Sequence, residues 1–210
     1  RSDVAFVGYT AIDGDYIRYN PEIVVTLHSN SPYPIESTDN FTVTVDGFEL
    51  DFDSLDYQFT PSTKDAPATL RFQPELEDCT YYFGFNGIDG KDVPVYEETP
   101  ELRLRVSTDN RIAELYNYPN PFAGETSFTF LLTGAEPPQD MQVKIYTVAG
   151  RLIRVLEYPA SSMRIGYNAL KWDGRDEDGD ELANGVYFYK VIAKFTDNTF
   201  ESIGRMAVMR

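Results

Sequence analysis

The sequence predicts an all-β protein built of two β-sandwiches in tandem, and three observations carry this prediction. Apolar and polar residues alternate with a period of two in short runs along the chain, which is the pattern of half-buried strands. Aromatic residues make up 14% of the sequence, with 15 Tyr and 14 Phe, and aromatic side chains favour strands. The length of 210 residues suits one large domain or two of about 100 residues each.

Six runs in the first half read as strands. They are EIVVTL (22–27), FTVTV (41–45), FELDF (48–52), TLRF (69–72), YYFGF (81–85) and ELRLRV (101–106). Asp46-Gly47 between two of these runs suits a two-residue hairpin, because the type I′ turn needs a positive φ at both central residues. Short strands with turn signals about every 8–12 residues predict a sandwich of immunoglobulin-like type for residues 1–110.

A boundary is expected near the middle of the chain. Residues 107–110 form a polar connection, and Tyr118-Pro119-Asn120-Pro121 cannot continue a β-ladder because proline has no N–H to donate. We therefore place a linker near residues 107–114 and a second domain at 111–210. The formal charge also changes here: residues 1–110 hold 7 Lys and Arg against 21 Asp and Glu, or −14, while residues 111–210 hold 11 against 13, or −2.

The second half repeats the strand pattern, again without a helical period. Its runs are SFTFLL (127–132), QVKIYTV (142–148), RLIRVL (151–156), NALKW (168–172), GVYFYKVIAKF (185–195) and FESIGRMAVM (200–209). Turns are expected at Ala149-Gly150, at Asp178-Gly179 and at residues 196–198. The second half is therefore predicted to be a second immunoglobulin-like sandwich.

Composition argues against several classes of function. The formal net charge of −16 would repel the phosphate backbone of a nucleic acid. No apolar run approaches the roughly 18 residues that a membrane span needs, and residues 1–3 do not begin a signal peptide, so we expect a cut edge of a longer protein. Cys79 is the only cysteine, so the chain can form neither an intrachain disulfide nor a cysteine-ligated zinc site.

Catalysis is not expected within this chain. His28 and Cys79 could formally make a nucleophile and base pair, but His28 lies in a turn-rich loop and Cys79 lies between an acidic turn and a strand. Carboxylates are so abundant that no pair of them indicates glycoside hydrolysis. No glycine-rich phosphate loop opens a helix. Any catalytic domain of the parent protein would lie upstream.

The stretch WDGRDEDGDELANGVYFYK (172–190) raises the question of a calcium site. An EF-hand loop has oxygen ligands at positions 1, 3 and 5, Gly at position 6 and Glu at position 12. With Gly179 at position 6, Gly174 falls at position 1 and Gly185 at position 12, so two ligands are missing. An irregular β-loop could still bind calcium weakly through Asp173, Asp176, Asp178 and Asp180. The favoured interpretation is a hairpin that turns at Asp178-Gly179, with no metal site and no cofactor.

Four motifs of the second half resemble a known family. They are YNYPNPF (116–122), VKIYTVAGRLIRVL (143–156), GYNALKWDGRDEDGDELANGVYFYK (166–190) and GRMAVMR (204–210). In this order they resemble the immunoglobulin-like domain shared by flagellar hook-capping proteins and by type A C-terminal sorting domains of the type IX secretion system. The first half resembles, more loosely, the β-sandwiches that precede such tails in large exported proteins with gingipain-like peptidase domains.

The resemblance implies a role in delivery. Such domains are recognised by an outer-membrane translocon and are often cleaved by a sortase that joins the cargo to a surface glycolipid. It implies a secreted or outer-membrane cell-surface location. The matched positions of the sorting signal are Pro119, Asn120, Pro121, Gly150, Gly185, Tyr187, Gly204 and Arg210. Each of these residues also has a purely structural explanation as strand punctuation or core.

Two alternatives remain open. The family resemblance also allows a hook-capping type of assembly domain. A module for adhesion, or for binding glycans or proteins, is the other alternative, because Tyr-rich sandwiches bind ligands through loops and residues 9–19 with Tyr33 could present exposed rings. In the sorting interpretation the first sandwich is a structural spacer.

Overall fold

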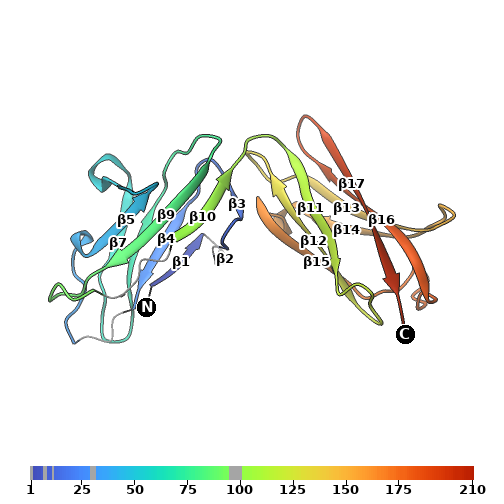
Figure 1. Cartoon of the computed structure of the whole chain (residues 1–210), viewed down its shortest axis with the longest axis horizontal. Coiled ribbons are helices and arrows are strands. Elements are labelled where there is room, and N and C mark those ends of the chain that lie inside the picture. Colours follow the sequence, from blue (N-terminus) through green and yellow to red (C-terminus); the bar gives the residue numbers. More distant parts are fainter. Residues whose placement is uncertain (1, 7–8, 11, 29–31, 95–100) are drawn as a thin grey trace. The chain divides into compact units, whose positions relative to one another are not determined.

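The computed structural model describes residues 2–6, 9–10, 12–28, 32–94 and 101–210. The chain forms two compact units, Arg1–Val106 and Ser107–Arg210, each of which is considered separately below (Figure 1). The division lies slightly N-terminal to the boundary expected after residue 110. The all-β class is confirmed: the described residues contain 17 strands, and their only helices are three short 3₁₀ turns.

Unit 1 consists of two five-stranded sheets. The first has the order β2-β1-β4-β8-β7, and the second has the order β3-β10-β9-β5-β6. The strands are β1 (Ser2–Phe6), β2 (Tyr9–Thr10), β3 (Tyr16–Ile17), β4 (Ile23–Leu27), β5 (Phe41–Val45), β6 (Phe48–Glu49), β7 (Tyr57–Thr60), β8 (Ala68–Phe72), β9 (Thr80–Gly87) and β10 (Glu101–Val106). Alternate residues of β4 and β8 are buried with Phe83 and Phe85 of β9 in one core.

The Asp46-Gly47 hairpin is confirmed in unit 1. Both residues have a positive φ, +53° and +82°, and Val45 pairs with Phe48. The strand expected at residues 48–52 is shorter, because the Asp51 side chain accepts a hydrogen bond from the Asp53 amide and begins the 3₁₀ turn η2 (Phe52–Ser54). A second such turn, η1 (Thr38–Asn40), precedes β5.

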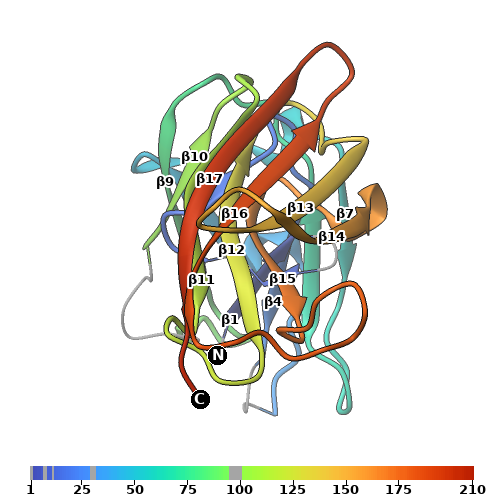
Figure 2. The ribbon, with the colours of Figure 1, turned by 90° about the vertical axis from the view of Figure 1, so that its right-hand side faces the viewer.

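Unit 2 is a sandwich of seven strands. Its three-stranded sheet has the order β11-β12-β15, and its four-stranded sheet has the order β14-β13-β16-β17 (Figure 2). The strands are β11 (Arg111–Tyr118), β12 (Thr126–Thr133), β13 (Asp140–Thr147), β14 (Leu152–Pro159), β15 (Gly166–Trp172), β16 (Gly185–Lys194) and β17 (Thr199–Val208), with the 3₁₀ turn η3 (Ala160–Ser162) before β15. Its core holds Phe128, Phe130 and Trp172 from one sheet and Val143 and Tyr189 from the other.

The linker expected near residues 107–114 is wrong in its second part, because β11 begins at Arg111. The pairing of β11 with β12 shifts between Ala113 and Tyr116, and Glu114 has φ +51°. Such a bulge adds one residue to the strand and breaks the period of two. Asn117 rather than an apolar residue then occupies a buried position. The strand therefore lacks the sequence pattern by which the others were recognised.

Each unit contains a tyrosine whose hydroxyl bonds to the backbone four residues upstream, just after the chain has crossed between the sheets. In unit 1, Tyr81 at the start of β9 donates to the Glu77 carbonyl (3.2 Å) and accepts from the Glu77 amide (3.0 Å). In unit 2, Tyr187 at the start of β16 donates to the Ala183 carbonyl (2.8 Å). This is the tyrosine corner of immunoglobulin-like sandwiches. Both units thus share a feature of the predicted fold.

Candidate functional site

The PNPF segment (residues 119–122) lies along the free edge of β17. The Asn120 side chain accepts a hydrogen bond from the Ala207 amide (2.9 Å) and donates to the Arg205 carbonyl (3.3 Å). The Phe122 amide then donates to the Ala207 carbonyl at 3.0 Å. Because the flanking prolines have no N–H, the side chain of Asn120 replaces a backbone partner. The edge of the last strand is therefore covered from Arg205 onward.

Buried polar groups fix the start of this segment. The Pro119 carbonyl accepts hydrogen bonds from the Thr126 hydroxyl (2.9 Å) and from the Asn117 amide group (3.2 Å). Asn117 and Thr126 are themselves buried, and they also bond to each other at 3.2 Å. A buried polar group that lacked a partner would destabilise the fold, so these contacts hold the backbone at Pro119 in one position.

Phe122 anchors the same segment in the core, a role that was not predicted from the sequence. Its ring is buried and packs edge-on against Trp172, with ring centroids 5.8 Å apart. Trp172 stacks on Phe128 at 5.9 Å, and Phe128 lies 4.8 Å from Tyr189. The four rings link both sheets. The signal in the sequence was the apolar residue that ends the YNYPNPF motif.

Arg210 ties Ala123, which directly follows the PNPF segment, to the acidic segment (residues 173–184). Its guanidinium donates to the carbonyls of Leu182 (2.9 Å) and Ala123, and pairs with the Glu181 carboxylate at 3.1 Å. Its backbone amide donates to the Asn184 side chain (2.9 Å), which in turn donates to the Arg210 carbonyl (3.3 Å). A single arginine therefore joins three separate stretches of sequence at one end of unit 2.

The acidic segment is not the hairpin that the sequence analysis favoured. It connects β15 to β16, and these two strands belong to different sheets, so it crosses the sandwich. A tight turn does exist inside it: Gly179 has φ +86°, and the Asp176 amide donates to the Asp180 carbonyl at 2.9 Å. The sequence showed this local turn correctly. It did not show the sheet to which each flanking strand belongs, which depends on contacts distant in sequence.

The carboxylates of this segment serve its own backbone. One Asp176 oxygen accepts hydrogen bonds from the amides of Asp178 (3.1 Å) and Asp180 (2.9 Å). Asp173 accepts from the Arg175 amide at 3.2 Å. Across the described ranges, no group of three or more His, Cys, Asp or Glu side chains is arranged to hold a metal ion. The four candidate calcium ligands therefore have no shared ligand set.

The three glycines that match the sorting signal of the resembling family have structural roles. Gly150 has φ +83° in the β13–β14 hairpin, where its amide donates to the Thr147 carbonyl at 2.9 Å. Gly185 pairs with Val208. Gly204 lies opposite Tyr189, and a Cβ on Gly204 would come within 2.2 Å of the tyrosine ring. Only a glycine leaves room for that ring.

Two tyrosines of unit 2 have raised pKa values. Burial raises the pKa of Tyr189 to about 12. Burial, assisted by the nearby Asp173 carboxylate, raises the pKa of Tyr158 to about 12, and the Tyr158 hydroxyl donates to the Lys171 carbonyl at 3.0 Å. Burial is the leading cause of the raised pKa in both tyrosines. The shifts are therefore explained by packing and do not indicate a proton-transfer site.

The structure places His28 and Cys79 in separate parts of unit 1. His28 follows β4 of one sheet, and Cys79 precedes β9 of the other. Cys79 is an exposed free cysteine whose carbonyl accepts a hydrogen bond from the Val106 amide at 2.8 Å. The backbone of Cys79 thus supports the last strand of the unit.

Two of the tyrosines considered for ligand binding are covered by cations. The Arg105 guanidinium lies 4.2 Å from the centre of the Tyr16 ring, and the Lys91 ammonium lies 5.1 Å from that of Tyr33. Tyr33 and His28 also line a depression of about 690 Å³ with Lys64 and Asp65. The depression is lined by both polar and apolar residues. Tyr16 and Tyr33 each stack with a cation, so they do not form a flat aromatic surface for a sugar ring.

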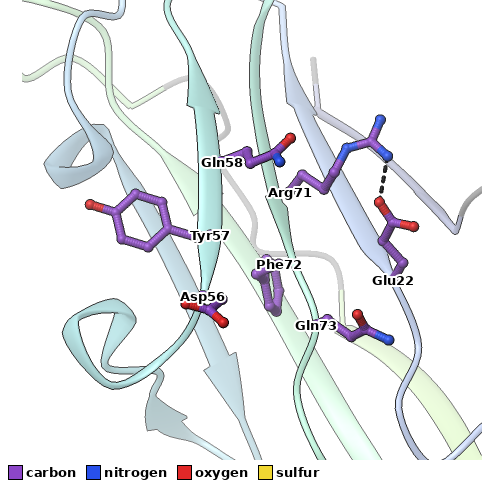
Figure 3. A pocket seen from close by; sticks show the side chains of 7 residues that line it. All are labelled: Glu22, Asp56, Tyr57, Gln58, Arg71, Phe72 and Gln73. Carbon is purple, nitrogen blue, oxygen red and sulfur yellow. Dashed lines mark hydrogen bonds and ion pairs between the residues drawn. The ribbon is translucent and has the colours of Figure 1, made fainter.

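A shallower pocket of about 370 Å³ lies on the sheet that contains β4, β8 and β7. Gln58, Arg71 and Gln73 extend from its strands, and Arg71 points to Glu22 (Figure 3). The Arg71 and Glu22 side chains form an ion pair of 2.5 Å, with 43% and 38% of each side chain exposed. The positive charge of Arg71 is therefore neutralised by the carboxylate of Glu22 within this pocket.

Residues 117–197 match the family model of the FlgD Ig-like domain. This stretch is an immunoglobulin-like domain, and it covers most of unit 2 but less than half of the chain. No curated protein matches the sequence. No helix of the described residues is long and apolar enough to cross a membrane.

Several solved structures are similar to the chain at low identity. Dimeric latent PorU from Porphyromonas gingivalis has a TM-score of 0.43 and 18% identity; the match covers 99% of this chain and 20% of PorU. Fibronectin(III)-like modules of CbhA from Clostridium thermocellum have a TM-score of 0.33 and 11% identity, covering 98% of this chain and 93% of theirs. Chicken CNTN1 domains FN1–FN3 have a TM-score of 0.36 and 10% identity, covering 95% and 67%. The chain thus spans a fifth of PorU, and none of these likenesses identifies a function.

Proposed function

We propose that unit 2 is a secretion and sorting domain of the type IX class and that unit 1 is a structural spacer, both in a bacterial protein that is secreted or held at the cell surface. One observation carries the proposal. The PNPF segment, the acidic segment and Arg210, which are the parts of the sequence that resemble the sorting family, meet at one end of unit 2 through hydrogen bonds of Asn120 and Arg210. A single surface built from separate motifs is what a receptor for a folded domain would recognise.

The proposed partners are a translocon and a sortase, with a surface glycolipid as the acceptor of the cargo. Recognition would involve the surface around Arg210, because this residue is joined to two other segments and cannot move without them. The Arg210 side chain is 25% exposed, so part of it remains accessible to a partner. No cofactor and no catalytic step are assigned to these residues.

A spacer role for unit 1 follows from its construction. The unit has its own core, and a short polar connection at residues 107–110 leads to β11. A sandwich of about 100 residues folds as an independent domain, and a short connection limits the reach of its neighbour. Unit 1 would keep an upstream domain at a distance from whatever unit 2 binds.

A hook-capping type of assembly domain is the second candidate for unit 2, and the match of residues 117–197 to the FlgD Ig-like domain favours it. In that case unit 2 would bind other copies of a structural protein rather than a translocon. Loss of export in a strain without the translocon would argue against this candidate, since assembly in a filament does not depend on that machinery.

Expression of a periplasmic reporter fused in front of residues 107–210 tests the proposal. In a bacterium that has the type IX system, the reporter should reach the surface or the medium, and in an otherwise equal strain without the translocon it should stay in the periplasm. Circular dichroism of the purified fusion controls for folding. A folded fusion that stays periplasmic in both strains would overturn the sorting function.

A further inference from the structure

The outward face of the four-stranded sheet in unit 2 carries large apolar side chains. Met141, Val143 and Ile145 of β13 are buried, so the intervening residues of the sheet point away from the core. Four apolar residues on this outer side are exposed, from 39% for Phe188 to 67% for Ile203, with Val186 and Leu152 between these values. The half-buried ring of Tyr146 lies in the same cross-strand row as Leu152 and Phe188.

Three cations lie among these apolar residues. Lys144 of β13 is directly opposite Lys190 of β16, which in turn is opposite Ile203 of β17. Arg205 is opposite Phe188. We call the surface formed by Lys144, Lys190 and Arg205 with Tyr146, Phe188 and Ile203 the basic apolar face; the four strands that carry it lie side by side toward the viewer in Figure 2.

The lysine pair opposes stability. Like charges directly opposite each other on a sheet are unfavourable, and Lys144 and Lys190 occupy such positions. Lys190 is partly compensated by the Glu201 carboxylate at 2.8 Å, a bond that also raises the pKa of Lys190. Among the residues that the structure describes, Lys144 and Arg205 form no ion pair. An external anion would therefore relieve a repulsion that the folded unit contains.

Three carboxylates lie on the outer side of the sheet, and one of them, Glu201, contacts Lys190 at 2.8 Å. Glu157 is two residues beyond Val155, where it accepts a bond from Gln142 (3.5 Å), and Asp140 is opposite Lys194. The rows that contain Phe188 and Lys144 have no carboxylate. Within the described part of the chain, Lys144 and Arg205 therefore carry the unpaired positive charge of this face, although the chain as a whole has a charge of −16.

We propose that the basic apolar face binds the surface of an anionic lipid bilayer. Lysine is depleted in the cores of protein interfaces, whereas at a membrane its long stem lies along apolar neighbours while the ammonium reaches the phosphates. The exposed apolar side chains come from strands β14, β16 and β17 of one sheet, so they lie on one face of unit 2. Phe188, Val186 and Ile203 enter the headgroup region, and Lys144 and Arg205 attract the anionic lipids.

Vesicle co-sedimentation of the full chain tests this binding. The probes are vesicles of phosphatidylcholine alone and of phosphatidylcholine mixed with phosphatidylglycerol. We expect partitioning onto the anionic vesicles only, and a loss of roughly fivefold for each positive charge removed, so that Lys144→Gln binds about fivefold more weakly. The double substitution Lys144→Glu with Arg205→Glu should abolish binding, and Ile203→Ser should weaken it without any change of charge.

Lys171→Gln is the matched control for Lys144→Gln. Lys171 is exposed on the outward side of the other sheet of unit 2, so the same change of charge leaves the basic apolar face intact. Thermal unfolding checks that each variant is folded. Failure of the folded wild-type chain to prefer anionic vesicles would overturn the proposal. An equal loss of binding in Lys171→Gln and Lys144→Gln would also overturn it, because it would indicate attraction by diffuse charge alone. Binding in a pull-down to an acidic protein but not to vesicles would assign the face to a protein partner instead.

Discussion

The two units differ in how the free edge of their last strand is covered. In both, an early segment pairs in parallel with the last strand: β3 pairs with β10 in unit 1, and Phe122 bridges Val208 of β17 in unit 2. Unit 1 uses backbone for this contact, since the Arg105 amide donates to the Asp15 carbonyl at 2.9 Å. Unit 2 has prolines at positions 119 and 121, so the Asn120 side chain makes the first bonds to β17, and backbone bonding begins only at Phe122, whose amide donates to the Ala207 carbonyl.

Comparison of the two units distinguishes residues that the shared fold requires from residues that are particular to unit 2. A tyrosine corner occurs in both units, at Tyr81 and at Tyr187, so Tyr187 is explained by the fold whatever unit 2 does. The bonds of Asn120 and Arg210 belong to the particular way in which unit 2 is closed. Of the matched positions, these two are therefore the most informative for function.

The largest expected effect is that of Gly204→Ala. The added methyl would lie 2.2 Å from the Tyr189 ring, which is buried and cannot move aside. Overpacking of this kind costs about 3 kcal/mol of the free energy of unfolding. Calorimetry should show a lower melting temperature for unit 2 and an unchanged transition for unit 1. The control Gly150→Ala, whose Cβ meets open space, should cost about 1 kcal/mol through its positive φ.

Alkaline pH should lower the free energy of unfolding of unit 2 more than that of unit 1. The folded state raises the pKa of Tyr189 from 10.0 to about 12, so the unfolded chain loses this proton first and stability falls as the pH rises between these values. The loss is about 2 kcal/mol at the upper end. The buried rings Phe83 and Phe85 of unit 1 have no proton to lose. Urea unfolding across this range should show a smaller loss in Tyr189→Phe, and equal pH dependence in both chains would contradict the expectation.

Arg210→Ala should weaken the end of unit 2 where the motifs meet. It removes bonds to two carbonyls and the pair with Glu181, at a cost of about 1–2 kcal/mol. Arg175→Ala is the control: Arg175 bonds to the Gly179 carbonyl and to Glu181 within the acidic segment, so its removal should cost about 0.5 kcal/mol or less. Hydrogen exchange at the Phe122 amide, which is bonded to the Ala207 carbonyl, should accelerate only in Arg210→Ala. Equal losses of stability in Arg210→Ala and Arg175→Ala would contradict the role of Arg210 in holding the separate segments together.

The tyrosine corners offer a test of equivalence between the units. Tyr81→Phe and Tyr187→Phe each remove one hydroxyl and should each cost about 1 kcal/mol, every change affecting only the transition of its own unit. A much larger effect of Tyr187→Phe would mean that this residue does more than hold the corner.

The smallest effect has the opposite sign. Lys144→Glu replaces the repulsion with Lys190 by an attraction and should stabilise unit 2 by about 0.5 kcal/mol, measured as a higher melting temperature. The same substitution should weaken binding to anionic vesicles. A variant that gains stability while it loses binding would be difficult to explain by misfolding.

The sequence predicted the strands with regular alternation, such as β5, β13 and β16. In a half-buried strand the side chains point alternately to the core and to solvent, so apolar and polar residues alternate in the sequence. It missed β11, where a bulge at Glu114 interrupts the period. It also missed the crossing of the acidic segment, because the sheet that a strand joins is decided by partners far away in sequence. Asn120 and Arg210 were selected through family resemblance, and their contact partners became visible only in the folded chain.

Localisation of a reporter fused separately to each unit tests the central claim most directly. In a bacterium with the type IX system, the reporter followed by residues 107–210 should appear on the cell surface or in the medium, and the reporter followed by residues 1–106 should remain in the periplasm. Both fusions are to be verified as folded by circular dichroism. Retention of the folded 107–210 fusion in the periplasm, or export of both fusions alike, would contradict the assignment of the sorting function to unit 2.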